Sequence, residues 1–254
     1  MLPLLLLLGI GMHTTWKKGR LRPLRDRLLG VAAVAVAISI IVGAAIYGQF
    51  RPMAIIGFAL ALWVMGSALL IPFARLRAGQ KLSGAVLGMA VAHFGIGLVT
   101  LGITGVQSFK VEKDVALAVG DAATIAGYDF RLAALRDALG PNYAAAEADV
   151  IVSKNGVTVT TLHPQKRLYN SGGNPMTEAG IEVGAGRDLF AALGEELGQG
   201  RWSMRLQYKP LIRYIWLGAL LIALGGGIAG LDRRYRRVNA VEPARGATVA
   251  EATR

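Results

Sequence analysis

Four apolar segments, each about twenty residues long, constrain the fold of this chain more than any other feature. They cover residues 28–48, 53–73, 85–106 and 211–231. A helix rises about 1.5 Å per residue, so each segment is long enough to cross a hydrocarbon core of about 30 Å. The sequence therefore predicts a membrane α-helical protein with four full transmembrane helices.

A shorter apolar stretch, MLPLLLLLGIGM, occupies residues 1–12. Twelve residues are too few for a spanning helix. The basic residues follow this stretch, whereas a signal peptide carries them in front of its apolar region. We expect a truncated first span, so that the chain is the C-terminal part of something longer. An interfacial anchor or a misplaced start is the alternative.

Basic residues gather in three clusters that predict the orientation of the spans. The clusters are Lys17–Arg27, Arg75–Lys81 and Arg233–Arg237. Short basic segments next to membrane spans stay in the cytoplasm. An even number of spans separates one cluster from the next, so all three fit the same side. The sequence thus predicts a cytoplasmic basic tail at 232–254 and an inserted domain at 107–210 on the opposite, extracytoplasmic face.

The net charge of +12 raises the question of nucleic-acid binding. Residues 107–210 hold 11 Lys and Arg against 12 Asp and Glu, whereas the rest of the chain holds 17 against 4. The basic excess therefore lies beside the apolar segments, and the only sizeable soluble region lacks the basic face that phosphate binding requires. We expect no nucleic-acid partner. The chain has no cysteine, which excludes disulfides and thiolate metal sites.

The inserted domain reads as mainly β. Asn155-Gly156 lies between two β-branched runs, and this dipeptide is typical of a two-residue hairpin turn. Two further segments, FKVEKDVALAVGD and RWSMRLQYKP, alternate apolar with polar residues. One segment, RDLFAALGEELGQG, predicts a short helix over Asp188–Leu197 with Gly198 near its C-cap. We expect a small β-sandwich or barrel with one short helix.

No catalytic constellation is apparent in this domain. The acidic pairs Glu112 with Asp114 and Glu195 with Glu196 read as solvated surface, and His163 reads as an exposed histidine rather than a metal ligand. The segment Lys166–Thr177 combines basic residues with Gly172-Gly173 and Asn174-Pro175, which is typical of a loop that presents polar groups.

His93 is the one ionisable side chain within the third apolar segment. Such residues usually face a bundle interior, a cavity or a cofactor. Small residues flank it, namely Gly88, Ala92, Gly95 and Gly97. They would admit either a planar cofactor or a neighbouring helix. From the residues alone, cofactor ligation, an interhelical hydrogen bond and a proton relay all remain open.

Four segments, in this order, resemble the C-terminal portion of the CcmF family, the haem lyase subunit of bacterial cytochrome c maturation. They are MAVAHFGIGLVTLGITG, KRLYNSGGNPMTEAGI, RDLFAALGEEL and RWSMRLQYKPLIRYIWLGALLIALGG. The resemblance covers residues 1 to about 237. It implies that His93 is an axial ligand of the iron of a membrane-embedded haem b. The family's Trp-rich motif and its other functional histidines lie upstream and are not present.

The resemblance further implies a function at the periplasmic face of the bacterial inner membrane, namely covalent attachment of haem to apocytochrome c. The implied partners are the missing N-terminal CcmF portion, the haem chaperone CcmE, CcmH-type subunits and apocytochrome c. We do not expect this chain to be active as an enzyme without the missing portion. The β-domain would then be a docking surface for partner subunits or for the apocytochrome.

Two alternatives come from other classes. In the first, the protein is non-enzymatic, the helices are an anchor and the β-domain binds a protein partner. In the second, the chain is a transporter subunit. The spans lack the paired intramembrane charges and broken helices that substrate pathways show, and Pro52 and Pro72 lie at the expected span ends, which disfavours a transporter.

Overall fold

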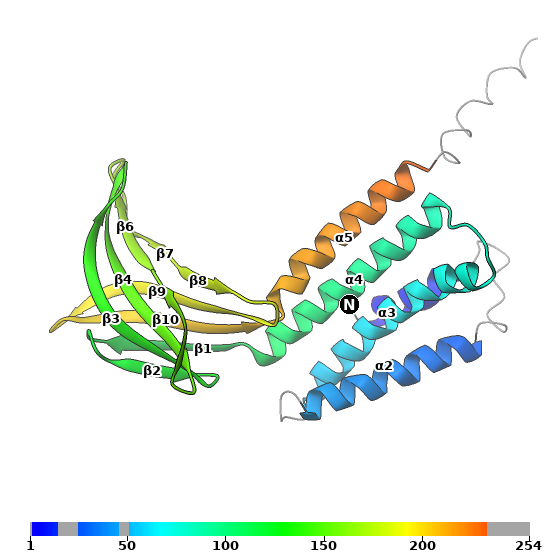
Figure 1. Ribbon diagram of the computed structural model, residues 1–254, viewed down its shortest axis with the longest axis horizontal. Coiled ribbons are helices and arrows are strands. Elements are labelled where there is room, and N and C mark those ends of the chain that lie inside the picture. Colours follow the sequence, from blue (N-terminus) through cyan, green and yellow to red (C-terminus); the bar gives the residue numbers. More distant parts are fainter. Residues whose placement is uncertain (1, 15–24, 46–50, 233–254) are drawn as a thin grey trace, which may run out of the picture. The chain divides into compact units, whose positions relative to one another are not determined.

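The computed structural model describes residues 2–14, 25–45 and 51–232 (Figure 1). They form two compact units. The helical unit comprises the described residues up to Leu101 and those from Tyr214 onward, and the β unit comprises Gly102–Arg213. Most of the first basic cluster, residues 46–50 of the first interhelical connection and the basic tail from residue 233 lie outside the described residues.

Four helices are long and apolar enough to cross a membrane, which confirms the expected membrane helical architecture. The four are α2 (Arg25–Ala45), α3 (Pro52–Arg77), α4 (Gly84–Phe109) and α5 (Ile212–Gly230), and the shorter apolar helix α1 (Leu2–Gly11) precedes them. Pro52 lies in the first turn of α3, where its missing N–H costs nothing. Pro72 was expected at the end of this span, but α3 continues through it to Arg77.

Helices α4 and α5 approach each other closely through glycines. A Cβ added to Gly88 would lie 2.4 Å from the carbonyl oxygen of Gly225, and one added to Gly95 would lie 2.7 Å from that of Gly218. At the end of this interface, the backbone N–H of Ala85 donates to the Asp232 carboxylate at 2.7 Å. Small residues let two helix backbones pack directly in a lipid environment.

The β unit contains ten antiparallel strands in two sheets. The strands are β1 (Val111–Leu117), β2 (Ala122–Ile125), β3 (Tyr128–Leu139), β4 (Tyr143–Lys154), β5 (Val157–Leu162), β6 (Gln165–Tyr169), β7 (Met176–Glu178), β8 (Gly180–Val183), β9 (Arg187–Gly198) and β10 (Arg201–Pro210). Sheet A has the order β1-β10-β9-β8. Sheet B has the order β2-β3-β4-β6-β7, with β5 also paired to β4.

The two sheets enclose one apolar core. Alternate residues of each strand point inward, so Phe130 and Val150 of sheet B and Leu193 and Leu206 of sheet A are fully buried in the same cluster. The mainly-β expectation is thus confirmed. The predicted hairpin is also present, because Asn155 and Gly156 connect β4 to β5 with φ of 51° and 78°.

The helix expected over Asp188–Leu197 is wrong, because this segment is strand β9. Ala, Leu and Glu favour a helix locally, but the apolar residues of this segment also recur at every second position, as in a strand. Leu189, Ala191 and Leu193 point into the core, while pairing with β8 and β10 satisfies the backbone on both sides. Tertiary pairing overrides the local preference, and Gly198 is the last residue of β9, directly before the turn to β10, with a positive φ of 84°.

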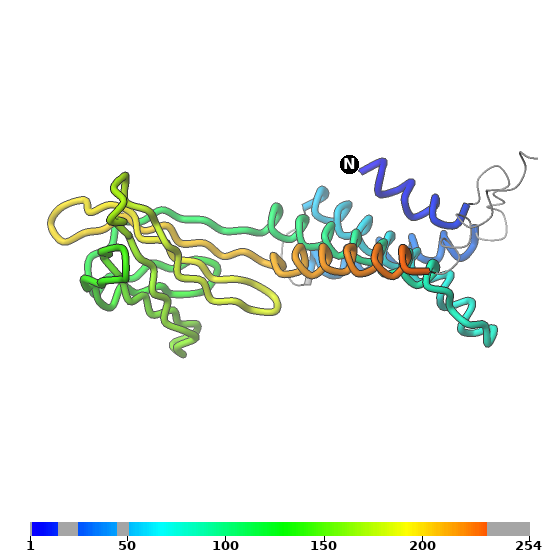
Figure 2. The backbone as a smooth tube through the Cα atoms, turned by 90° about the horizontal axis from the view of Figure 1, so that it is seen from above, coloured from blue at the N-terminus to red at the C-terminus, as the bar shows by residue number. Residues whose placement is uncertain are grey.

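The topology also explains how a β unit is inserted between two helices. The first strand, β1, pairs directly with the last, β10, with Val111 opposite Tyr208 (Figure 2). The chain therefore enters and leaves the β unit at neighbouring positions of one sheet. Gly105, in the last turns of α4, allows the side chain of Leu211 to pack against it, 2.7 Å from where a Cβ would stand.

Candidate functional site

His93 lies on α4, the tenth residue of a 26-residue apolar helix. Its side chain is half-buried, and its Nδ1 is 2.8 Å from the backbone carbonyl oxygen of Met89, one turn earlier. A carbonyl oxygen only accepts hydrogen bonds, so Nδ1 carries the proton and donates. In a neutral imidazole this leaves the lone pair on Nε2. The ring thus presents a fixed nitrogen ligand atom away from its own helix.

The small residues around His93 serve helix packing. Gly88, Ala92 and Gly95 receive α5, and a Cβ on Gly97 would lie 2.8 Å from the carbonyl oxygen of Ala61 in α3. Of the two roles that the sequence leaves open for them, the structure shows the approach of other helices. His93 itself makes no hydrogen bond to another helix among the residues that the structure describes. The interhelical hydrogen bond is therefore disfavoured, and Nε2 remains free for a ligand.

His13, just after α1, is a second imidazole of the helical unit. Both of its ring nitrogens are buried, and its polar neighbour among the described residues is the backbone of Ser67 in α3. Unlike His93, it has no hydrogen bond to the carbonyl one turn earlier in the described residues. This makes it a matched histidine against which any role of His93 can be tested.

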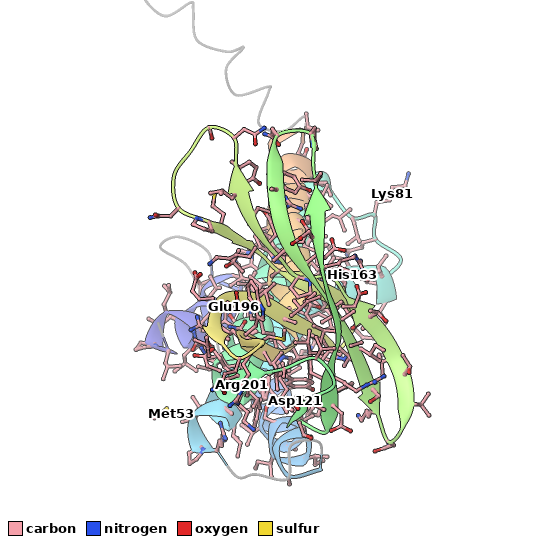
Figure 3. All side chains as sticks on the ribbon, turned by 90° about the vertical axis from the view of Figure 1, so that its left-hand side faces the viewer. Met53, Lys81, Asp121, His163, Glu196 and Arg201 are labelled. Carbon is pink, nitrogen blue, oxygen red and sulfur yellow. The ribbon has the colours of Figure 1, made fainter. Side chains whose placement is uncertain are left out.

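The outer face of sheet B carries a polar network that the sequence did not reveal. Arg136 of β3 donates to both Glu147 and Asp149 of β4, and His163 donates from Nδ1 to Asp149 at 2.7 Å. The amide of Gln165 donates to the remaining oxygen of Glu147. His163 is exposed at the surface of the β unit (Figure 3). Strand register brings these side chains together from sequence positions up to 29 apart. No short sequence motif therefore indicates that they are neighbours.

The chemistry of this network favours ion pairing over a metal site. Glu147, Asp149 and His163 each place a ligand atom within 4.8 Å of the others. However, all four carboxylate oxygens already accept hydrogen bonds, two of them from the Arg136 guanidinium. The hydrogen bonds from Gln165 and Arg136 lower the pKa of Glu147. For Asp149, partial burial raises the pKa, but the bonds from Arg136 and His163 outweigh it and the net shift is downward.

The expected polar loop at 166–177 is wrong in most of its length. Lys166 and Arg167 belong to β6, and Met176 and Thr177 belong to β7, so only residues 170–175 form the connecting turn. Pairing alternates the side chains between two faces. Lys166 therefore points to Glu195 at 2.7 Å, whereas Arg167 lies over the Tyr143 ring on the other face. In the other acidic pair, Arg205 bridges Glu112 and Asp114.

Comparison with known proteins identifies the β unit first. Residues 108–210 match the family described as the CcmF C-terminal beta-sandwich. The resemblance to the C-terminal portion of CcmF is confirmed. The chain is 37% identical over 237 residues to the cytochrome c-type biogenesis protein CcmF of Escherichia coli (strain K12), and 38% identical over 239 residues to CcmF of Pseudomonas fluorescens. These matches cover 93% and 92% of this chain.

The matches cover only 37% and 36% of those two CcmF relatives, so the chain spans little more than a third of their length. The cytochrome c-type biogenesis protein ccl1 of Rhodobacter capsulatus gives the same picture, with 37% identity over 99% of this chain and 39% of the relative. The solved structure titled "Cytochrome c Heme Lyase CcmF" shares the fold, with a TM-score of 0.75 and 23% identity over 90% of this chain and 38% of that one.

Proposed function

We propose that this chain forms the C-terminal part of a cytochrome c haem lyase, in which His93 is an axial ligand of a membrane-embedded haem b. One observation carries the proposal: Met89 holds Nδ1–H of His93, so that Nε2 alone is left to bind a metal. Haem iron takes an imidazole nitrogen as ligand, and a carbonyl bonded to the opposite ring nitrogen orients the ring and raises its basicity. The names of the relatives, cytochrome c-type biogenesis and heme lyase, support the same function.

The residues of α4 would tune this ligand. When bound, haem b supplies one-electron chemistry for the haem that is being attached. The apolar residues of α4 around His93 would limit the access of water to the ligand. Among the described histidines, only His93 lies within a spanning helix and is anchored through Nδ1 to a backbone carbonyl of that helix. The second axial ligand would therefore come from the portion of CcmF that this chain does not span.

The proposed orientation follows from charge. Basic residues follow α3 and α5 and precede α2, which favours the cytoplasm for those ends by the positive-inside rule. The β unit would then lie in the periplasm, where the haem chaperone CcmE, CcmH-type subunits and apocytochrome c are accessible. The basic tail would lie in the cytoplasm, and the protein would be a multi-pass protein of the bacterial inner membrane.

One end of sheet B is the best candidate for a docking surface. Leu139, Leu168 and Met176 are 87%, 49% and 59% exposed at the end formed by the β3–β4 and β6–β7 hairpins. Exposed apolar residues beside charged ones are typical of protein interfaces. This surface also suits the second candidate function, a non-enzymatic anchored β-domain that binds a protein partner.

The test is a reduced-minus-oxidised visible spectrum of the chain, purified in detergent together with a co-expressed upstream CcmF portion. We expect a b-type signal in the wild type, loss of that signal in His93→Ala and retention in the matched variant His13→Ala. Similar yields of the co-purified complex control for folding. A signal that survives His93→Ala in an intact complex would contradict the ligand role.

The second candidate gives a different pattern. If the helices are only an anchor, the complex contains no haem, and Leu139→Glu with Leu168→Glu abolishes capture of a periplasmic partner. In the haem lyase, the same double variant reduces cytochrome c maturation while the b-type signal stays at its wild-type level. The two readouts therefore separate the two functions.

A further inference from the structure

Helices α2 and α3 form an open groove of about 830 Å³ on the helical unit, and α4 contributes Phe94 to it. Its walls are apolar side chains such as Val34 and Ile38 of α2 and Leu69 and Phe73 of α3. At its floor the two helices are in close contact, because a Cβ on Gly66 would lie 2.7 Å from the Val31 side chain. The volume lies within the range of small-molecule sites, about 300–1,000 Å³.

Two arginines occupy one end of this groove. Arg27 lies in the first turn of α2 and Arg77 is the last residue of α3, and both line the same groove. From Arg27 the groove extends along α2 to Ile38. Eleven residues of helix correspond to about 16 Å. This is about half of a hydrocarbon core of roughly 30 Å, the thickness of one leaflet.

Within the described residues, the acidic side chain nearest in sequence to Arg27 is Asp26, which pairs with Arg25 instead. No Asp or Glu occurs in the sequence between Asp26 and Glu112. Within the described parts of the chain, neither Arg27 nor Arg77 forms an ion pair, whereas Arg25 pairs with Asp26 at 3.2 Å. Arg25 lines a separate pocket together with Leu6 and Trp63. Both arginines are exposed at the helix ends, so their guanidinium groups are accessible to an anion from outside the helical unit.

We infer that the groove binds one anionic phospholipid, with an acyl chain along α2 and α3 and the phosphate between Arg27 and Arg77. Arginine binds phosphate through paired N–H donors. The length of the groove distinguishes this occupant from a transmembrane helix of another polypeptide, which would need a groove through the full thickness of the membrane. The site is independent of the role proposed for His93.

The test uses the full chain in mild detergent, with phosphatidylglycerol and phosphatidylcholine of identical acyl chains as probes, and native mass spectrometry to count bound lipids. We expect one phosphatidylglycerol per chain, bound in preference to phosphatidylcholine. Arg27→Gln and Arg77→Gln should each weaken the binding of phosphatidylglycerol about fivefold, because one basic residue near an anionic surface contributes about that factor to the affinity. Arg25→Gln and Arg75→Gln, in the same helix turns but outside the groove, should retain the preference.

A second pair of variants tests whether the acyl chain occupies the groove. Val34 and Val36 are both exposed on α2, but Val34 lines this groove and Val36 lines the separate pocket. Val34→Trp should lower the binding of both lipids, and Val36→Trp should leave both unchanged. Equal binding of the two lipids, equal effects of the arginine controls, or unchanged binding in Val34→Trp would each overturn the inference. So would a cross-link from Val34→Cys to a co-purified polypeptide with loss of the lipid.

Discussion

The β unit buries its large apolar side chains, whereas the helical unit exposes many of them. In the β unit, Phe130 and Leu132 are completely buried between two sheets. In the helical unit, large apolar residues such as Ile41 and Leu220 face outward. Water drives apolar burial in the first case, whereas lipid tails are themselves apolar and supply no such force. Stability therefore depends on large core residues in the β unit and on small residues between helices in the membrane.

The two units also differ in how they satisfy polar groups. In the β unit, Glu147 and Asp149 have a donor for every carboxylate oxygen. In the helical unit, Nε2 of His93 and the guanidinium groups of Arg27 and Arg77 have no protein partner among the described residues. A polar group without a partner is costly in an apolar medium, and exposed basic residues at the end of a membrane span attract anions. We therefore expect ligands at the helical unit and a structural role for the network on sheet B.

The largest expected effect concerns the glycine interface. A Cβ on Gly225 would lie 2.4 Å from the backbone nitrogen of Ala92, whereas nothing lies within 4 Å of one on Gly226. Gly225→Leu should therefore separate α4 from α5, and Gly226→Leu should be tolerated. Because the chain has no cysteine, a pair introduced at Gly84 and Asp232 reports on this interface by disulfide formation. Cross-linking in Gly225→Leu at the wild-type level would show that small residues are not what holds these helices together.

The second largest effect concerns the apolar core of the β unit. Leu132→Ala removes a fully buried side chain from the β core and should lower the free energy of unfolding of the β unit by about 2–5 kcal/mol. Leu139→Ala, in the same strand but 87% exposed, should change it little. Denaturant unfolding of the full chain, followed by near-UV circular dichroism, measures both. Equal losses in the two variants would mean that the sheets do not form a packed core.

Sequence reasoning succeeded where one local property decides the structure. Length and apolar composition suffice for a spanning helix, and Asn155-Gly156 suffices for a tight turn. It failed for β9, where Ala, Leu and Glu favour a helix and only pairing with β8 and β10 selects the strand. The prediction of a loop over 166–177 was wrong for the same reason, because strands β6 and β7 in this segment are stabilised by pairing with residues distant in the sequence.

The sites divide in the same way. His93 is conspicuous in the sequence because it is the one ionisable residue in an apolar run. The anchoring of its Nδ1 by Met89 follows from helix geometry only once the rotamer is known. The Arg136 network and the groove between Arg27 and Arg77 join residues from different strands or helices. Strand register and helix rotation determine which of these residues meet, and neither property can be predicted from one sequence segment alone.

A smaller effect concerns the turn that the sequence did predict. Gly156 has a φ of 78°, so Gly156→Ala places a side chain in the left-handed region at a cost of about 1–2 kcal/mol. Gly186 has no positive φ and nothing within 4 Å of an added Cβ, so Gly186→Ala is the matched control. Thermal unfolding of the full chain compares them. A neutral Gly156→Ala would indicate that the β4–β5 turn relaxes without cost.

The smallest effect concerns pH and the Arg136 network. The folded pKa of Glu147 and that of Asp149 lie below their ordinary values, so these carboxylates stabilise the fold above the ordinary carboxyl range of about pH 4. This stabilisation is lost as the pH falls through the folded pKa values. Arg136→Gln should therefore destabilise the β unit at neutral pH, and its difference from the wild type should shrink as the pH falls below the ordinary carboxyl range and through the lowered folded pKa values, where both carboxyls become protonated. Arg131→Gln, on the same strand without a described carboxylate partner, controls for net charge. A deficit of Arg136→Gln that persists unchanged in acid would mean that Arg136 acts through packing of its stem rather than through its charge.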